Sequence, residues 1–236
     1  MEKQRLDKFL SAQKGFSRSE ARNIIRKTGL YVDGISVFDP SFTIDPDSSS
    51  VVFKGENIEY KKYIYILMNK PKGVLSASED KSRKTVVDLV PDELKRRELA
   101  PVGRLDKDTT GLILLTDDGV FSHNCISPSK SVQKVYEAVL DGDVTQSMIE
   151  SFAKGTILAD GTVCKRAILE RIGENKARII ITEGKYHQIK RMFGTVGLGV
   201  VDLKRIKIGK LVIPEYLKEG ECIELSCEEA QCALAV

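Results

Sequence analysis

Two polar clusters contain the residues whose types and spacing suit chemistry, and the first is residues 103–111. It is a loop with Arg104, Asp106 and Asp108, bracketed by two glycines and followed by the apolar run 112–115. A loop anchored against a buried strand holds a carboxylate rigidly at the edge of a cleft. Asp106 and Asp108 are therefore candidate acid, base or nucleophilic groups. Aspartates in a glycine-bounded loop are also common turn formers, so the cluster alone leaves both interpretations open.

The second cluster is residues 183–193, which combines basic and apolar side chains. Ile189, Met192 and Phe193 have the spacing of a helix that packs by its apolar side. Lys190 and Arg191 are then candidates to face a carboxylate or phosphate groups. His187 precedes them as a candidate substrate-binding residue, with a structural role as the alternative.

Composition limits the class of protein. The 236 residues are 42% hydrophobic and 30% charged, enough for one core and a small satellite domain. There is no apolar run long enough for a membrane span and no apolar secretion signal, so we expect a cytoplasmic protein. The five cysteines form no CxxC pair, which favours reduced thiols and no metal site. No glycine-rich phosphate loop is present, which argues against a nucleotide cofactor.

Charge is unevenly distributed along the chain. The net charge is only +3, but residues 1–30 contain eight Lys or Arg against three acids, and residues 183–210 contain seven against two. Two separate basic surfaces are one interpretation, and solvated charged faces are the other.

The N-terminal region has the pattern of a compact module. A helix over 5–13 ends near Gly15, and Ser17 with Glu20 predicts a capping box that opens a second helix closed by Gly29. A hairpin over 30–37 follows, and residues 45–62 have the composition of the module's end plus a linker. We therefore expect domains at 1–60 and 61–236. Three arginines recur every four residues on one side of the second helix: Arg18, Arg22 and Arg26.

Beyond residue 60 the chain alternates short strands with a few helices. We expect strands over 63–68, 112–115, 135–140, 167–172, 177–181 and 200–203, helices over 145–154 and 186–196, and a hairpin turn at residues 117–119. This order lacks a regular strand-helix repeat. It predicts an α+β domain with a mostly antiparallel mixed sheet flanked by helices, preceded by a small N-terminal α/β domain.

The N-terminal segment resembles the alpha-L RNA-binding domain first known from a small-subunit ribosomal protein. The residues that carry the resemblance are RLDKFL and SRSEARNIIRKTGLYVDG, with the hairpin that follows. The resemblance implies contact with the RNA backbone, for which Arg18, Arg22 and Arg26 are the candidates.

The two polar clusters resemble motifs of pseudouridine synthases. GRLDKDTTGLILLTDDG resembles their catalytic motif and EGKYHQIKRMF their later motif, while MNKPKG and SHNCISPSKSVQKVY fit the same family. The match is to the RsuA type and runs over essentially the whole chain. It implies the pseudouridine synthase fold and a reaction without a cofactor or metal.

The resemblance also implies roles for individual residues. Asp106 matches the essential aspartate, and Lys190 matches the basic residue paired with it. Arg104 matches the arginine that helps to extrude the target nucleotide, and Tyr136 matches the tyrosine that stacks on the uracil, with a core tyrosine as the alternative. His187 and Arg191 are further substrate-binding candidates. Gln133 and Val135 depart from the family pattern, where glutamate and threonine are expected.

The resemblance points to small-subunit (16S) ribosomal RNA, through Tyr186-His187, Ser122-His123 and residues 126–128. The expected partner is ribosomal RNA within an assembling small subunit, acted on by a monomer without a membrane or nucleotide cofactor. Two alternatives stay open: a synthase for large-subunit RNA, and a non-catalytic RNA-binding assembly factor.

Overall fold

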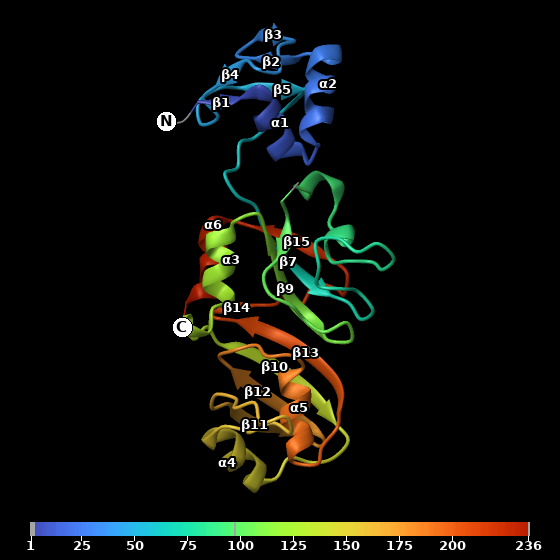
Figure 1. The fold of residues 1–236 in the computed structure, drawn as a ribbon, viewed down its shortest axis with the longest axis vertical. Coiled ribbons are helices and arrows are strands. Elements are labelled where there is room, and N and C mark those ends of the chain that lie inside the picture. The colour runs from blue at the N-terminus through green and yellow to red at the C-terminus, as the bar shows by residue number, and fades with distance from the viewer. Residues whose placement is uncertain (1–2, 97, 236) are drawn as a thin grey trace. The chain divides into compact units, whose positions relative to one another are not determined.

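The computed structural model describes residues 3–96 and 98–235, which form two compact units (Figure 1). One unit contains the chain up to Ile64 together with Val90–Leu99, and the other contains Tyr65–Leu89 and the chain from Ala100 onward. Val90–Leu99 thus belongs to the first unit, although it lies in the sequence between two segments of the second unit. In the described residues, no helix has the length and apolar character needed to cross a membrane.

The first unit packs two helices against small sheets. The sheet order is β3-β2-β5-β6, with β1 paired to β4. The elements are β1 (Gln4–Arg5), α1 (Leu6–Lys14), α2 (Arg18–Thr28), β2 (Leu30–Val32), β3 (Ile35–Val37), β4 (Thr43–Ile44), β5 (Val51–Phe53), β6 (Glu56–Asn57) and a 3-10 turn at Asp92–Leu94. Phe9 and Ile25 of the helices share a core with Val51 of β5.

Local sequence signals explain the ends of both helices. Gly15 has a φ of 71° and ends α1 in the left-handed region, as its sequence position indicates. The predicted capping box is confirmed, because the Ser17 side chain accepts from the Glu20 nitrogen and the Glu20 carboxylate accepts from the Ser17 nitrogen. The segment 45–62 is less of a linker than its composition suggests, since it contains β5 and β6.

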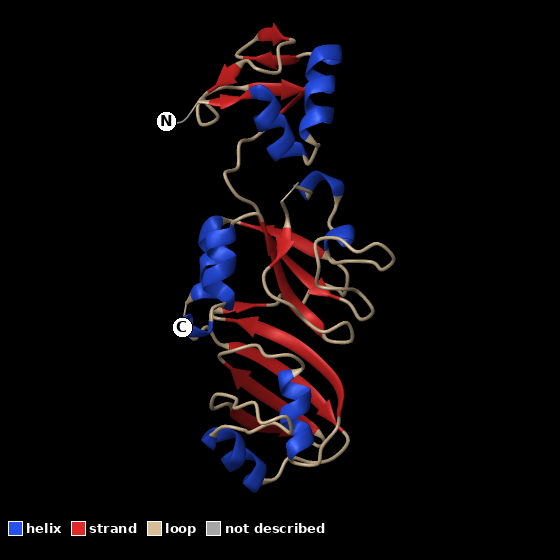
Figure 2. Cartoon of the chain, in the orientation of Figure 1, coloured by secondary structure: helices blue, strands red, loops and turns tan. Residues whose placement is uncertain are grey.

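The second unit is built on one mixed sheet with helices beside its strands (Figure 2). The main order is β11-β12-β10-β13-β9-β7-β15, and β8 and β14 pair with β9 and β13. The strands are β7 (Tyr65–Lys70), β8 (Ala100–Pro101), β9 (Thr110–Thr116), β10 (Lys134–Leu140), β11 (Ile168–Gly173), β12 (Lys176–Ile181), β13 (Val200–Ile208), β14 (Leu211–Val212) and β15 (Cys222–Leu225). The predicted α+β class with a mostly antiparallel sheet is confirmed.

The predicted helices over 145–154 and 186–196 are confirmed, with ends within two residues, and two further helices of this unit were not predicted. The four helices are α3 (Gly119–Ile126), α4 (Gln146–Lys154), α5 (Gln188–Thr195) and α6 (Cys227–Gln231), with 3-10 turns at Val87–Leu89, Pro128–Lys130 and Cys232–Leu234. The predicted hairpin turn at residues 117–119 is wrong. Asp118 is instead the N-cap of α3, where its carboxylate accepts from the nitrogens of Val120 and Phe121.

One close approach of two backbones joins the halves of this sheet. Among strand pairings of the described residues, β9 and β13 alone run parallel, and Gly111 lies opposite Arg205. Gly111 has a φ of 100°, and a β-carbon there would collide with the Arg205 carbonyl oxygen and lie 2.9 Å from the Arg205 nitrogen. Only glycine therefore fits at this position.

We predict that Gly111→Ala destabilises the second unit by about 3 kcal/mol or more, because it adds both a backbone clash and left-handed strain. The measurement is urea unfolding followed by circular dichroism. Gly194→Ala is the control, since a β-carbon in that part of α5 meets no atom within 4 Å. Equal midpoints for the two variants would show that the β9–β13 contact tolerates a side chain.

Candidate active site

A buried lysine forms hydrogen bonds with the backbone of the loop that carries Asp106. Lys70 at the end of β7 is 0% exposed. Its Nζ donates to the carbonyl oxygens of Pro71, Lys107 and Thr109 at 3.1, 3.2 and 3.0 Å. Burial lowers the pKa of Lys70 to about 8, with the charges of Asp108 and Asp106 opposing the shift, so the ammonium keeps its proton at neutral pH.

Two further contacts hold the same loop. The Ser76 hydroxyl donates to the Leu105 carbonyl at 2.8 Å and accepts from the Leu105 nitrogen at 3.0 Å. The Gly73 nitrogen donates to the Lys107 carbonyl at 2.8 Å. The segment that begins with MNKPKG therefore positions the loop, a role that sequence reasoning missed. A lysine at the end of an apolar strand, directly before a proline, was the available signal.

The second cluster folds as a tight turn that leads into α5. His187 is the N-cap residue of α5, with a φ of 47° and a ψ of 33° in the left-handed region. Buried Gln188 fixes this turn, because its Nε2 donates to Glu183 at 2.9 Å and its Oε1 accepts from the Lys185 nitrogen at 2.9 Å. The turn therefore presents His187 in one fixed orientation.

One pocket of the second unit brings together side chains from both clusters. Its lining includes five of the residues selected from the sequence: Arg104, Asp106, Tyr136, His187 and Lys190. The His187 Nε2 lies 3.5 Å from one oxygen of Asp106, and the Lys190 Nζ lies 4.0 Å from the other. A carboxylate, a guanidinium, an imidazole, an ammonium and an aromatic ring thus share one concave surface.

Lys190 makes its short contact with a different carboxylate from the one expected. Its Nζ donates to Asp108 at 2.6 Å, while Asp106 is the more distant partner. The hydrogen bond from Lys190 lowers the pKa of the Asp108 carboxyl. Lys190 therefore bridges both aspartates, and Asp108 holds it at the edge of the pocket.

Tyr136 rests on a buried arginine that the sequence patterns did not single out. Arg205 of β13 is 3% exposed. Its Nε donates to the Leu112 carbonyl at 2.8 Å, its Nη1 lies 3.4 Å from the Tyr136 hydroxyl, and the guanidinium carbon lies 5.9 Å from the centre of that ring. Because a guanidinium only donates, the hydroxyl accepts from it and its own hydrogen points elsewhere. Arg205 thus fixes both the ring and the hydroxyl of Tyr136.

Arg191 lies outside the pocket lining. Its Nη2 forms an ion pair with Asp160 at 2.5 Å, and its Nη1 donates to the Tyr186 carbonyl at 3.3 Å. Hydrogen bonds from Thr162 and then from Arg191 lower the pKa of Asp160 to about 2. The expected basic surface over 183–210 is therefore divided, with Arg205 buried and Arg191 paired. No cluster of three His, Cys, Asp or Glu side chains suited to a metal ion occurs among residues 3–96 and 98–235.

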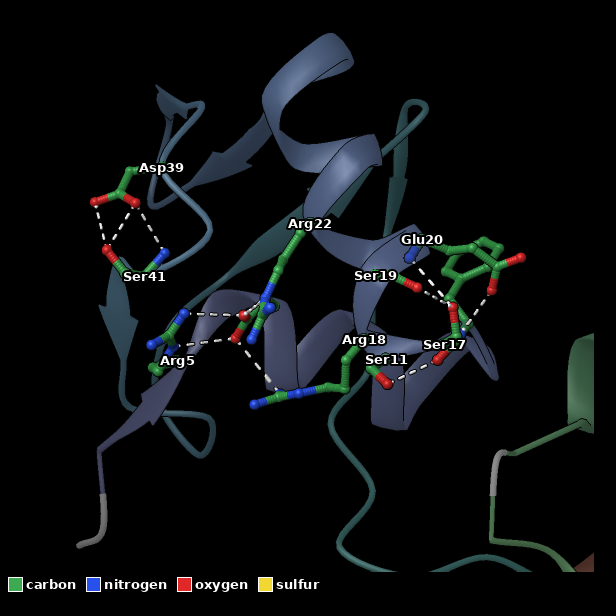
Figure 3. A network of polar contacts seen from close by, with 11 residues as sticks. Arg5, Ser11, Ser17, Arg18, Ser19, Glu20, Arg22, Asp39 and Ser41 are labelled. Carbon is green, nitrogen blue, oxygen red and sulfur yellow. Dashed lines mark hydrogen bonds and ion pairs between the residues drawn. The ribbon is translucent and has the colours of Figure 1, made fainter.

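The N-terminal unit gathers arginines around one buried carboxylate. Asp7 is 0% exposed, and Arg5, Arg18 and Arg22 lie 3.0, 3.4 and 2.9 Å from its oxygens. Figure 3 shows the three arginine side chains converging from β1 and α2. Arg26 forms no ion pair in the described part of the chain. Two of the three predicted RNA-binding arginines are thus oriented by Asp7.

Comparison with known proteins gives matches over both units. A family model described as RNA pseudouridylate synthase matches residues 64–195, and an S4 domain model matches residues 4–49. The chain is 41% identical to the uncharacterized RNA pseudouridine synthase YtzG of Bacillus subtilis, over 95% of this chain and 96% of that protein. It is 39% identical to ribosomal small subunit pseudouridine synthase A of Escherichia coli, over 95% and 97%. A crystal structure of a pseudouridylate synthase superposes with a TM-score of 0.69 at 35% identity, covering 97% of this chain and 99% of that one.

We predict that Lys70→Met loosens the loop, because three carbonyl groups lose their buried donor. The cost is about 3 kcal/mol, which corresponds to about hundredfold faster amide hydrogen exchange over residues 104–110. Exchange measured by mass spectrometry tests this. Lys72→Met, at an exposed lysine paired with Asp202, is the control and leaves loop exchange unchanged. Unaltered loop protection in Lys70→Met would contradict the role of the ammonium.

We predict that Asp7→Asn lowers the stability of the N-terminal unit at neutral pH but not in acid. Burial alone raises the pKa of Asp7, but hydrogen bonds from Arg22 and Arg5 and the charge of Arg18 outweigh it and lower that pKa. A depressed carboxyl pKa contributes stability that is present above the unfolded pKa and lost as pH falls through the folded one. The difference in stability between wild type and Asp7→Asn therefore decreases as the pH falls below about 4. Thermal unfolding at several pH values measures it, with exposed Asp47→Asn as the control.

Proposed function

The chain belongs to the RsuA-type family of RNA pseudouridine synthases, and from that premise we propose that it isomerises one uridine of small-subunit ribosomal RNA with Asp106 as the catalytic carboxylate. The observation that carries the proposal is the pocket in which Asp106, Tyr136 and Lys190 meet from three separate segments of the chain. A protein that only binds RNA has no need of this combination.

The reaction defines what the pocket has to supply. Conversion of uridine to pseudouridine breaks the bond from N1 to C1′, turns the base and joins C5 to C1′. Nothing is added and nothing is removed except the exchange of a C5 proton for a proton on N1. The requirements are a charged carboxylate, a surface for the uracil and a way to expose the base.

Asp106 meets the first requirement. Burial disfavours the charged form of a carboxylate, and nearby cations oppose that effect. The Lys190 Nζ lies 4.0 Å from one oxygen of Asp106 and the His187 Nε2 lies 3.5 Å from the other, so the ammonium stabilises the negative charge and the imidazole adds a polar neighbour. A charged Asp106 can attack C1′, attack C6 or remove a sugar proton, and each of these routes begins at the same carboxylate.

Tyr136 and Arg104 meet the other requirements. Extrusion of a base from a stem costs a few kcal/mol, and stacking on an aromatic face offsets part of that cost. Tyr136 lines the pocket and offers such a face, held in place by Arg205. Arg104 lies on the same loop as Asp106, is exposed, and takes the place that the uridine leaves in the stem.

The N-terminal unit supplies charge for the RNA backbone. Arg18 and Arg22 are oriented by Asp7, and Arg26 follows them one helical turn later. His187 and Arg191 are further candidate contacts beside the pocket. We propose that these basic residues hold the phosphates and that the chain acts as a monomer.

The small subunit is the target that the relatives favour. Several bacterial relatives are named ribosomal small subunit pseudouridine synthase A, at 37–39% identity and with nearly complete coverage. The matching Tyr186-His187 pair supports the same branch. An assembling small subunit in the cytoplasm is therefore the proposed place of action.

We predict that wild-type protein produces a single new carbodiimide-dependent primer-extension stop in small-subunit RNA free of native pseudouridine, and that Asp106→Asn produces none. The substitution keeps the shape of the side chain and removes its charge, so RNA binding survives while turnover falls below detection. The RNA is presented both naked and in assembling subunits.

Asp143→Asn is the matched control, since it removes an exposed carboxylate of the same unit that pairs with Arg171 and does not line the pocket. It retains the stop. Substantial turnover by Asp106→Asn would overturn the catalytic assignment, and a stop in large-subunit RNA would overturn the choice of target. No stop on any RNA with wild-type protein would favour a binding factor.

A further inference from the structure

An exposed aromatic pair lies at the rim of the candidate pocket. The rings of Tyr186 and His187 are stacked, with centroids 3.9 Å apart and an interplanar angle of 17°. The Tyr186 side chain is 73% exposed, whereas His187 lines the pocket and reaches Asp106 at 3.5 Å. The pair therefore extends from the catalytic carboxylate outward into solvent.

The turn that carries this pair is rigid. His187 holds the left-handed N-cap conformation of α5, and the Gln188 side chain ties the turn to Glu183. The Tyr186 carbonyl accepts from Arg191 at 3.3 Å. Because the backbone is fixed on both sides of the ring, little conformational freedom is left to lose when another ring covers Tyr186.

The outer face of Tyr186 has no partner in the described residues, since its one ring contact there is with His187. A flat aromatic face stacked on a second ring matches the size and shape of a nucleobase, and every base has a surface that stacks on it. Lys185 directly precedes the pair, and its ammonium, which donates to the Val163 carbonyl, supplies positive charge for the phosphates that accompany the base.

We propose that Tyr186 and His187 form a stacking subsite for an unpaired RNA base adjacent to the target uridine. The proposal rests on the proposed function, because a uridine turned into the pocket leaves its neighbours with one uncovered face. That uncovered face is the chemical feature the subsite recognises. The proposed subsite therefore requires a loop or an opened stem around the target uridine and excludes a regular duplex.

The test uses full-length protein and an RNA on which wild-type turnover has first been measured. Each neighbour of the target is replaced in turn by an abasic nucleotide, or by a fluorescent adenine analogue that stacking quenches. The variants are Tyr186→Ala, Tyr186→Phe, which keeps the face, and Tyr216→Ala, which removes a ring 72% exposed in the same unit.

Tyr186→Ala is expected to raise KM about tenfold with kcat little changed, and to abolish quenching at one neighbour. Tyr186→Phe and Tyr216→Ala behave as wild type. The abasic substitution at that neighbour raises KM for wild type to the same extent but adds nothing to Tyr186→Ala, because both remove the same contact.

Equal KM values for Tyr186→Ala and Tyr216→Ala would overturn the subsite. Additive effects of Tyr186→Ala and the abasic substitution at every neighbour would overturn it as well. Failure of the proposed function would give a different result, because wild-type protein would then form no pseudouridine on any ribosomal RNA. The subsite would be rejected together with the function in that case. Circular dichroism confirms that each variant is folded before the comparison.

Discussion

The pairing of β9 with β13 at Gly111 and Arg205 is the contact on which the candidate site depends. Gly111 ends the loop that carries Asp106, and Arg205 lies beneath Tyr136, so the contact sets the distance between the carboxylate and the ring. The pairing also joins the strands β11, β12, β10 and β13 to β9, β7 and β15. A side chain at Gly111 would separate these two halves of the sheet, and the pocket lies where they meet.

Buried cations support the pocket without neutralising its carboxylate. Lys70 donates to backbone carbonyls of the loop, and Arg205 donates to the Leu112 carbonyl and the Tyr136 hydroxyl. Carbonyl dipoles satisfy hydrogen bonds but leave the full charge in place, whereas a carboxylate partner would cancel it. The loop therefore gains rigidity and a positive field from the same side chains. That combination favours an anion in the pocket, as the proposed catalytic carboxylate requires.

Periodic and local signals allowed much of the fold to be predicted from the sequence. The capping box at Ser17 and Glu20 and the strand β10 need only neighbouring residues, so they were found. The pattern at Asp118 was misread because aspartate before glycine suits both a hairpin and an N-cap, and α3 has weak amphipathic character. Motif resemblance selected five pocket-lining residues. The roles of Lys70 and Arg205 depend on which distant backbone groups they meet, and one sequence contains no record of that.

Two aspartates of this chain show how environment separates a structural carboxylate from the proposed catalytic one. Asp7 accepts hydrogen bonds at 2.9–3.2 Å from Arg5 and Arg22, so its lone pairs are engaged and it can only organise its neighbours. The Asp106 carboxylate accepts no hydrogen bond from the described residues, and the nearest side-chain nitrogens, of His187 and Lys190, lie at 3.5 and 4.0 Å. At those distances charge is stabilised while the oxygens stay open toward the pocket. A carboxylate held by a rigid loop but not by its own oxygens keeps both its charge and its nucleophilicity, which is the condition that the proposed isomerisation requires.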